Sequence, residues 1–375
     1  MKSLTPAWYI VLCFARALVA GRANRVPEEP KKICIIQRAK LGDMVCTTPM
    51  FAAVKKYYPK AEVWVVGDEV NKQLLEGHPY VDGYIVWRRG TPLLTKELRA
   101  HGFDFLCITA PSAEAVASAY LAGVPCIVSP VIAGGWSPYE TRSYKLLRSL
   151  VLTRLHTMGQ YAPREYLRLL EPIGIYAEDT TKAITYSPEA ADMARSFFAE
   201  IKKGASMVVG VAPAAGNKIK QWPPERFAAV ANYVVEKHNA AVIVFGGPRD
   251  TEEVHAMMRS TTHPERIRVI PPLSIEEFKA FVAQTNLFVS ADTGPIYLAE
   301  AFAIPTIDIV GPVDEREQPP QGGRHIVIVP QREKPQLYVM NARVHDKAEV
   351  ERQSLATSVA EVCRAVDTFF SYTGK

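Results

Sequence analysis

Two glycine-containing turns, far apart in the sequence, each place an aspartate within a few residues after an apolar run. Asp43 follows Gly42 and the run Ile33–Ile36. Asp292 follows the run Leu287–Val289. A turn between a strand and a helix points free backbone N–H groups at whatever lies above the strand end, which favours anions. A carboxylate such as Asp43 can act there as a general base. The alternative is that Asp43 only caps the helix that follows.

Other residues in the second half of the chain suit a phosphate group. Lys220 lies on a loop between a strand and a helix, where its ammonium can reach a phosphate oxygen as a point charge. Thr293 and Gly294 supply a hydroxyl and backbone N–H groups at a helix start. Pro295 suits the first helical turn because no N–H is needed there. The structural alternatives are a solvated lysine and a plain capping turn.

A glycine pair and the absence of several motifs narrow the range of enzyme classes to which the chain could belong. Gly246 and Gly247 follow another strand and allow the backbone to approach a ligand or another helix closely. The fingerprint GxGxxG after the first strand and the phosphate loop GxxxxGK[ST] are absent from the sequence, which disfavours a nicotinamide oxidoreductase and a P-loop enzyme. The sequence also lacks HExxH, paired CxxC and DxD motifs, so no metal site is predicted.

Composition indicates a folded protein without a nucleic-acid partner. The chain has 375 residues, enough for two domains, and is 48% hydrophobic and 22% charged. Its net charge of +5 is mild; it does not indicate nucleic acid, but it suits anionic ligands or an anionic membrane surface. The six cysteines have no ligand spacing, and Cys34 and Cys107 fall in apolar runs. This pattern favours reduced, packed thiols in a cytosolic protein.

A regular alternation of strands and helices has to position these residues. After a linker at residues 21–31, apolar runs alternate with helical patterns, and the second half repeats that order. Such alternation predicts mostly parallel, doubly wound sheets. Strands are expected at Ile33–Ile36, Glu62–Val66, Tyr84–Trp87, Phe103–Thr109, Pro125–Ser129, Met207–Val211, Ala241–Phe245, Ile267–Ile270, Leu287–Ser290 and Thr306–Val310. Helices that bear on the sites are expected at Pro49–Tyr58, Pro295–Phe302 and Leu355–Tyr372.

Residues 1–30 are expected to form an amphipathic segment and a linker. Ala7–Ala20 is apolar except for Arg16, and a helix there would carry on one face Trp8, Val11, Leu12, Ala15 and Leu18. Arg22 and Arg25 would then lie near lipid head groups, which favours a helix at a membrane interface. A signal peptide cleaved near Val19-Ala20-Gly21 and a simple packing helix are the alternatives.

Residues 130–160 interrupt the alternation and predict a long loop. The segment is rich in Gly, Arg, Tyr and Trp, and it includes Gly134-Gly135-Trp136 and the basic residue Arg142. Long basic loops with aromatic residues are often binding loops. The alternative is a solvent-exposed surface loop that binds nothing.

Three motifs, in this order, resemble the family of ADP-heptose:lipopolysaccharide heptosyltransferases, glycosyltransferase family 9. The stretch ICIIQRAKLGDMVCTTP is similar to the family's first strand, Gly-Asp turn and Thr-x-Pro helix start. Lys220–Pro223 matches its K-x-W-P segment and Asp292–Pro295 its D-T-G-P turn. Gly311-Pro312 matches a later strand end, so the resemblance covers residues 32–313.

The resemblance implies a GT-B fold, α/β, with two Rossmann-like domains facing a central cleft. It implies an acceptor-binding domain at 31–186, with the C-terminal helix 355–372 crossing back to it, and a nucleotide-sugar-binding domain at 187–350. It further implies inverting, metal-independent transfer of a heptose or related sugar to a lipopolysaccharide core or similar glycolipid. The donor would be a nucleotide diphosphate sugar, with ADP-heptose expected, and no cofactor. We expect a cytoplasmic monomer, peripheral on the inner face of the inner membrane, that binds no nucleic acid.

The resemblance also assigns roles. Asp43 is expected to be the catalytic base and Lys220 the lysine on the donor diphosphate. The expected donor-binding residues are Gly216, Asp292, Thr293, Gly294, Gly246 and Gly247; the acceptor-side candidates are Gly42, Arg38, Lys40 and Arg142; no metal ligand is expected. The chain departs from the family where His often stands, at Tyr297, and in the loop Ala214–Asn217, where Ser or Thr is usual. These departures leave two alternatives: a transferase for another sugar donor, and a degenerate member that binds a nucleotide sugar or glycolipid without turnover.

Overall fold

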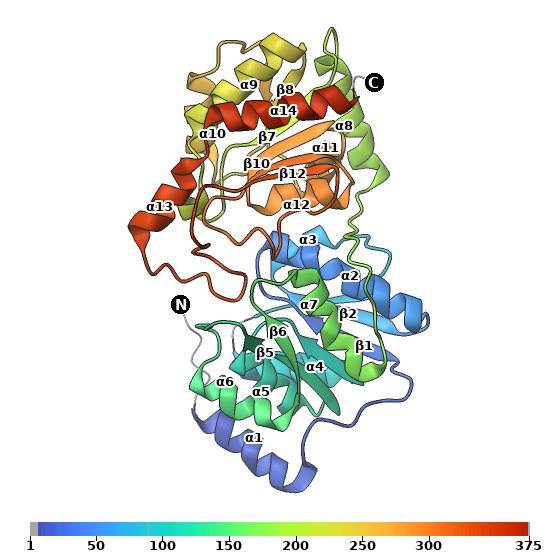
Figure 1. The fold of residues 1–375 in the computed structure, drawn as a ribbon. Coiled ribbons are helices and arrows are strands. Elements are labelled where there is room, and N and C mark those ends of the chain that lie inside the picture. Colours follow the sequence, from blue (N-terminus) through green and yellow to red (C-terminus); the bar gives the residue numbers. More distant parts are fainter. Residues whose placement is uncertain (1–6, 89, 374–375) are drawn as a thin grey trace. The chain divides into compact units, whose positions relative to one another are not determined.

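Two parallel six-stranded sheets organise the chain, and each belongs to its own unit (Figure 1). This computed structural model describes residues 7–88 and 90–373. The first unit contains Met1–Lys182 and Val339–Arg343, and the second contains Ala183–Tyr338 and Val344–Lys375. The prediction of mostly parallel α/β sheets is confirmed.

The first sheet has the strand order β3-β2-β1-β4-β5-β6, with every pairing parallel. This is the order of a Rossmann sheet, in which the direction of strand addition reverses beside β1. The central strands β1 and β4 are buried almost throughout, so they are apolar runs rather than alternating patterns. The strands are β1 (Lys32–Ile36), β2 (Glu62–Gly67), β3 (Gly83–Val86), β4 (Phe105–Ile108), β5 (Cys126–Ala133) and β6 (Leu152–Thr157).

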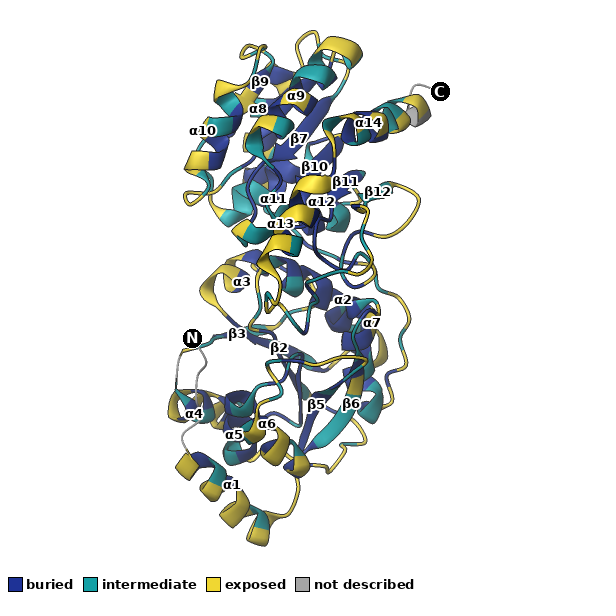
Figure 2. Ribbon diagram, turned by 60° about the vertical axis from the view of Figure 1, so that its left-hand side comes forward, coloured by how far each residue is buried: buried dark blue, intermediate teal, exposed yellow. Residues whose placement is uncertain are grey.

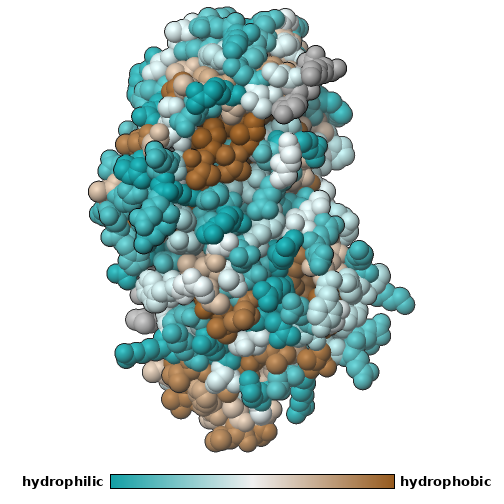
Figure 3. All heavy atoms as spheres, in the orientation of Figure 1, coloured by the Kyte–Doolittle hydropathy of each residue, from teal (hydrophilic) through white to brown (hydrophobic). Residues whose placement is uncertain are grey.

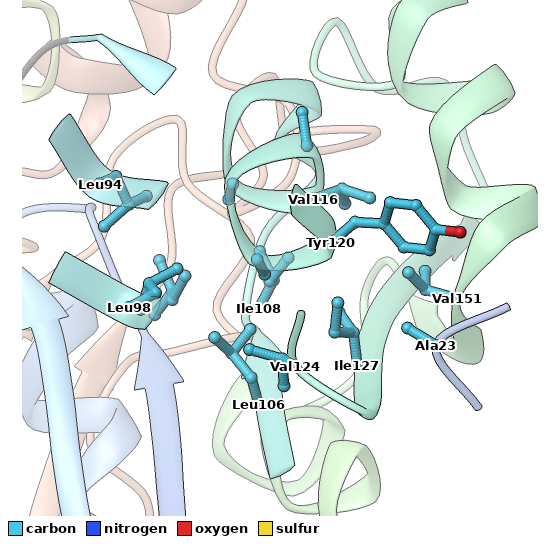
Figure 4. Packing of buried hydrophobic residues seen from close by; sticks show 14 of the residues in the cluster. Ala23, Leu94, Leu98, Leu106, Ile108, Val116, Tyr120, Val124, Ile127 and Val151 are labelled. Carbon is cyan, nitrogen blue, oxygen red and sulfur yellow. The ribbon is translucent and has the colours of Figure 1, made fainter. Parts of the chain in front are cut away.

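The core of the first unit includes a cluster closed by two helices, α4 (Thr91–His101) and α5 (Ala113–Ala122) (Figure 4). Leu98 of α4 and Tyr120 of α5 pack there with Ile108 of β4. The small residues of α5 are buried, which allows close packing against its neighbours. The other helices of this part are α2 (Leu41–Tyr57), α3 (Glu69–Leu74), α6 (Arg142–Leu147) and α7 (Ala162–Leu167).

Helix α2 begins at Leu41, so the prediction of a start at Pro49 was wrong. Pro49 lies inside the helix, where it has no N–H to donate to the carbonyl of Val45. The Thr48 hydroxyl donates to that carbonyl instead, at 2.8 Å. The carbonyl of Val45 thus keeps a hydrogen-bond partner although the helix runs through the proline, and Asp43 lies in the first turn of α2.

The predicted long loop over residues 130–160 was wrong for much of its length. β5 runs to Ala133, α6 follows, and β6 pairs with β5. β6 is an edge strand of mixed polarity (LTRLHT), so its sequence lacks the apolar run that marks a buried strand. Residues 134–141 remain as an irregular loop between β5 and α6.

The second sheet repeats the arrangement with the order β12-β11-β10-β7-β8-β9, again all parallel. Its strands are β7 (Val208–Ala212), β8 (Ala241–Val244), β9 (Ile267–Val269), β10 (Leu287–Ala291), β11 (Thr306–Ile309) and β12 (His325–Ile328). β12 was not predicted; it is a half-buried edge strand. The accompanying helices are α8 (Pro188–Ile201), α9 (Pro224–His238), α10 (Thr251–Arg259), α11 (Ile275–Ala283) and α12 (Gly294–Ala301).

The C-terminal helix does not cross back to the first unit, which corrects the expectation. The region forms two helices, α13 (Lys347–Ala356) and α14 (Val359–Thr373), both in the second unit. Val362 and Val366 of α14 are buried in that unit's core, and Asp367 accepts hydrogen bonds from the Tyr233 hydroxyl of α9 at 2.9 and 2.8 Å. The short segment Val339–Arg343 returns to the first unit instead, where Met340 O accepts a hydrogen bond from Ser137 Oγ at 2.6 Å.

Helix α1 (Ala7–Ala20) packs on the first unit through one side only. Tyr9 and Cys13 are buried, and the Tyr120 hydroxyl of α5 donates to Gly21 O just beyond the helix. The opposite side is exposed, as Figure 2 shows. Residues 1–6 of the predicted amphipathic segment lie outside the described residues. Within residues 7–88 and 90–373, none of the helices is long and apolar enough to cross a membrane.

Candidate active site

Asp43 is held in a fixed frame at the start of α2, the helix that follows β1. It is half-buried in the first turn of α2, where the helix dipole stabilises negative charge, and Gly42 beside it is buried. Its carbonyl accepts a hydrogen bond from Thr47 Oγ1 at 2.8 Å, and Gln37 Nε2 donates to the same Thr47 oxygen at 3.0 Å. The capping residue of α2 is Lys40, whose side chain makes no capping bond. Asp43 therefore sits at a helix start without being its cap.

The acceptor-side candidates have different surroundings. The guanidinium of Arg38 lies 3.6 Å from the centre of the Trp87 ring and 3.6 Å from a carboxylate oxygen of buried Glu114. Glu114 in turn accepts a hydrogen bond from Gly90 N at 3.0 Å. Arg38 thus has a packing role, and its contact with an acceptor stays a prediction. Lys40 and Arg142 are exposed, and Arg142 starts α6.

Tyr139, on the loop between β5 and α6, was missed as a site residue. Burial raises the pKa of Tyr139, and the neighbouring Asp43 carboxylate raises it further. The phenol therefore lies within electrostatic reach of the expected base. The sequence signal was the aromatic, glycine-rich segment itself, which indicated a binding loop without singling out this residue.

In the second unit, Lys220 and Asp292 form an ion pair. Lys220 lies in a short 3-10 turn, Lys218–Lys220; its ammonium contacts the Asp292 carboxylate and donates to Asp292 O at 2.9 Å. The Tyr297 hydroxyl donates to the other carboxylate oxygen. Asp292 is only 1% exposed, so its charge is balanced inside the protein. Lys220 can reach a phosphate only by sharing or leaving this partner.

The expected donor-binding turns lie against each other. Thr293 is the capping residue of α12, but its hydroxyl makes no capping bond and instead accepts one from Gly216 N at 3.4 Å. Gly294 is the first residue of α12. Trp222 is fully buried and donates from Nε1 to Thr357 O at 2.9 Å, which fixes the segment that carries Lys220. Pro295 has no N–H, and Ile296 N donates to Thr293 O at 3.1 Å, so Gly294 N and the Thr293 hydroxyl are the donors at this helix start, next to a lysine, that suit an anion.

Gly246 and Gly247 have structural roles at the end of β8. A Cβ on Gly246 would lie 2.6 Å from Val254 of α10, so the glycine permits close packing of that helix. Gly247 N donates to Asp250 Oδ2 at 2.8 Å. The close backbone approach expected from these glycines is thus made to a helix of the protein, and their contact with a donor stays a prediction.

A buried acid, Asp308 of β11, was not predicted. It is paired in register with Ser290 of β10, and it is 0% exposed. Among the described residues, neither oxygen of its carboxyl has a hydrogen-bond partner. Burial raises the pKa of Asp308 well above its usual range, and the charge of Asp292 raises it further, against the opposing effect of Lys220. Burial and the nearby charge of Asp292 thus both favour the protonated form of Asp308, whereas Lys220 opposes it.

Each unit thus carries a candidate group of its own. The first has the carboxylate of Asp43 in the first turn of α2, and the second has Lys220 beside the start of α12. In the part of the chain that the structure describes, no cluster of three or more His, Cys, Asp or Glu side chains could hold a metal ion.

Comparison with known proteins identifies relatives of this arrangement. A family model described as glycosyltransferase family 9 (heptosyltransferase) matches residues 93–345, a range that includes Lys220 and Asp292 but not Asp43. The lipopolysaccharide core heptosyltransferase OpsX of Haemophilus influenzae is 22% identical over 291 residues, covering 75% of this chain and 79% of that protein.

Solved structures share the fold. A glycosyltransferase family 9 protein of Veillonella parvula superposes with a TM-score of 0.73 at 21% identity, covering 91% of this chain and 98% of that one. The ADP-heptose lipopolysaccharide heptosyltransferase II of Escherichia coli gives a TM-score of 0.73 at 17% identity, covering 92% and 100%. These likenesses confirm the predicted GT-B fold class.

Proposed function

Because the chain belongs to glycosyltransferase family 9, the heptosyltransferase family, and is therefore a glycosyltransferase, we propose a specific reaction for it. The enzyme moves a heptose or related sugar from a nucleotide diphosphate sugar to a lipopolysaccharide core or similar glycolipid. ADP-heptose is the proposed donor, since relatives named for heptose transfer share the fold and the Lys220–Asp292 region lies within the family match.

The observation that carries the donor half is Lys220 beside the start of α12. Lys220, the Thr293 hydroxyl and Gly294 N are the proposed sources of positive charge and hydrogen-bond donors for a diphosphate. When the sugar leaves, negative charge grows on the diphosphate, and these groups stabilise it. In the proposed reaction they do so without a metal ion. Asp292 holds Lys220 until the donor arrives.

Asp43 is the proposed base. The acceptor oxygen attacks the anomeric carbon on the face opposite the diphosphate, and its proton passes to the Asp43 carboxylate as the new C–O bond forms. The bond from the anomeric carbon to the diphosphate oxygen breaks, and the diphosphate leaves with the electron pair. One displacement of this kind inverts the anomeric centre. The placement of Asp43 at a strand end, in the first turn of α2, supports this role.

A second candidate function is nucleotide-sugar binding without turnover. The observation in its favour is that Tyr297 and Lys220 both contact the carboxylate of Asp292. The three side chains therefore satisfy one another within the protein. A pure binder would not need Asp43. A thermal-shift screen of nucleotide diphosphate sugars, followed by a transfer assay with and without chelator, separates the two, because a bound ligand raises stability in either case and only an enzyme forms product.

We further propose that the enzyme works in the cytoplasm, on the inner face of the inner membrane. The exposed side of α1 carries Val11, Leu18 and Val19, exposed by 66%, 90% and 93%. Figure 3 shows apolar residues gathered at the bottom of the view, where Figure 1 places α1. Beside it, Lys96 and Arg99 of α4 help to line a groove of about 570 Å³ with residues of α1.

Charge supports the same docking. Residues 1–27 contain no Asp or Glu, and Arg16, Arg22 and Arg25 are all exposed. Apolar side chains that enter the head-group region together with arginines that meet anionic lipids are the features of a helix lying in the interface. Flotation with vesicles of phosphatidylglycerol or of phosphatidylcholine tests this proposal; we expect binding to the first and little to the second.

A further inference from the structure

The loop of residues 134–141, between β5 and α6, is tightly anchored. A Cβ on Gly135 would lie 2.7 Å from Met158 Sδ, so the chain presses against that side chain. Ser137 is 3% exposed, and its hydroxyl bonds to Met340 O of the returning segment Val339–Arg343 at 2.6 Å. Glu140 at the loop's far end forms an ion pair with Arg148. The loop is thus held in one conformation before any ligand binds.

This anchored loop nevertheless exposes its aromatic side chains. Trp136 is 54% exposed and Tyr139 is 41% exposed, and Tyr139 is the residue whose phenol lies within electrostatic reach of Asp43. Aromatic rings on a fixed backbone cost little conformational entropy when a ligand covers them, because the entropy has already been lost on folding. The C–H groups on the less polar face of a sugar ring pack well on such rings.

A cation from the returning segment completes the surface. The guanidinium of Arg343 lies 5.8 Å from the centre of the Trp136 ring, and Arg343 is exposed. A guanidinium can stack on an aromatic ring while its N–H groups bind a carboxylate or phosphate. We name the surface formed by Trp136, Tyr139 and Arg343 the aromatic platform. All three residues belong to the first unit.

We propose that the aromatic platform is a carbohydrate-binding subsite for an anionic sugar of the acceptor, with the sugar ring on Trp136 and its carboxylate or phosphate on Arg343. This inference rests on the proposed function, and it deepens it by naming the acceptor's chemistry. In this proposal the segment Val339–Arg343, which returns to the first unit, has a functional role because it supplies the guanidinium of Arg343.

The competing explanation is that Arg343 and Trp136 only fasten the returning segment to the loop. Ser137→Ala tests fastening, because it removes the bond to Met340 O and the bond that Ser137 Oγ accepts from Tyr139 N at 3.3 Å, while all three platform side chains are retained. Tyr176→Ala removes an exposed aromatic side chain elsewhere in the first unit, where Tyr176 is 72% exposed. Arg259→Gln removes an exposed arginine from the second unit.

The test is calorimetric binding of the inner-core oligosaccharide released from lipopolysaccharide by removal of its acyl chains, to the full-length protein. We expect Trp136→Ala and Arg343→Gln to weaken binding about tenfold or more, as one stacked or charged contact would. The variants Ser137→Ala, Tyr176→Ala and Arg259→Gln should bind within about twofold of wild type, and ADP affinity should be unchanged throughout. Dephosphorylated and carboxyl-reduced oligosaccharides then show which anionic group Arg343 binds.

Several results would overturn the inference: no binding by wild type, wild-type affinity in the Trp136 and Arg343 variants, an equal loss in Ser137→Ala, or full binding of an oligosaccharide that lacks both anionic groups. Oligosaccharide binding that depends on the platform, in a protein that transfers no sugar, would instead uphold the subsite and refute the proposed function. Transfer activity combined with unaltered oligosaccharide binding by the Trp136 and Arg343 variants would instead refute the subsite and uphold the proposed function.

Discussion

Replacement of Asp308 by asparagine should stabilise the protein, and increasingly so as pH rises. Asp308 is 0% exposed, and neither carboxyl oxygen has a hydrogen-bond partner among the described residues. Burial and the charge of Asp292 raise its pKa well above the usual range. We therefore expect the folded protein to keep a proton on Asp308 that the unfolded chain releases near its ordinary pKa of about 4. Asparagine has nearly the same shape and nothing to titrate.

The sign and size of this stability difference follow from proton binding by the folded and unfolded states. Below about pH 4 both states carry the proton, and Asp308 adds no pH dependence to the free energy of unfolding. Above about pH 4, only the folded state carries this proton. The free energy of unfolding therefore falls by about 1.4 kcal/mol per pH unit until the pH reaches the pKa of Asp308 in the folded protein. Between pH 5 and pH 8 the advantage of Asp308→Asn over wild type should therefore grow by up to about 4 kcal/mol, in full only if the folded pKa exceeds 8.

Urea unfolding at pH 5 and pH 8 measures this difference, with the slope on urea concentration checked for constancy. Asp314→Asn is the matched control, since Asp314 is equally buried but bonds to Arg316 through Nε at 2.8 Å and Nη2 at 2.6 Å. Burial alone would raise the pKa of Asp314, but these bonds hold it below the usual range, so its asparagine variant should lose stability at pH 8. A gap between Asp308→Asn and wild type that is constant with pH, or that narrows as pH rises, would refute the assignment of a neutral Asp308.

Further predictions concern the donor site and the membrane. Lys220→Ala should weaken ADP binding by about 1–3 kcal/mol and cost more than that in transition-state stabilisation, read from kcat/KM; equal losses would mean that Lys220 only holds the donor. Chelator should leave kcat/KM within about twofold, and a complete loss that added divalent metal restores would contradict the metal-free reaction. Leu18→Asp with Val19→Asp should abolish flotation on phosphatidylglycerol vesicles, because both side chains are exposed on α1, whereas the exposed control Leu355→Asp should float like wild type.

The sequence predicted the features that depend on local chain chemistry. Apolar runs marked the buried strands because both sheet faces are covered. The predicted helix at Pro295–Phe302 agrees with α12 to within one residue at each end, because Pro295 suits a first helical turn. The spacing of Trp8, Val11, Leu12 and Leu18 marked one face of α1, and that face is exposed.

The features that were missed depend on contacts between distant parts of the chain. Edge strands β6 and β12 are only partly covered, so they lack the apolar signal. Helix α14 packs on α9 because its apolar face fits the core of the second unit. The sequence of α14 alone does not indicate which core that face will join. Asp308 looked like part of an ordinary apolar strand, and its neighbour Asp292 becomes evident only when β10 and β11 are paired. The packing of Arg38 against Trp87 and Glu114 was not predicted, because these partners come from other parts of the chain; its contact with an acceptor stays a prediction.

The most direct test of the central claim is a transfer assay with Asp43→Asn alongside wild type. Purified full-length protein is incubated with ADP-heptose and a lipopolysaccharide inner-core acceptor, and the acceptor is analysed by mass spectrometry. Wild type should add one heptose with inverted anomeric configuration. Asp43→Asn should bind ADP normally and turn over roughly 10²–10⁴-fold more slowly, the usual range for loss of a general base. Turnover by Asp43→Asn within a few-fold of wild type, or clear ADP binding by wild type without transfer from any nucleotide sugar, would contradict the proposed reaction.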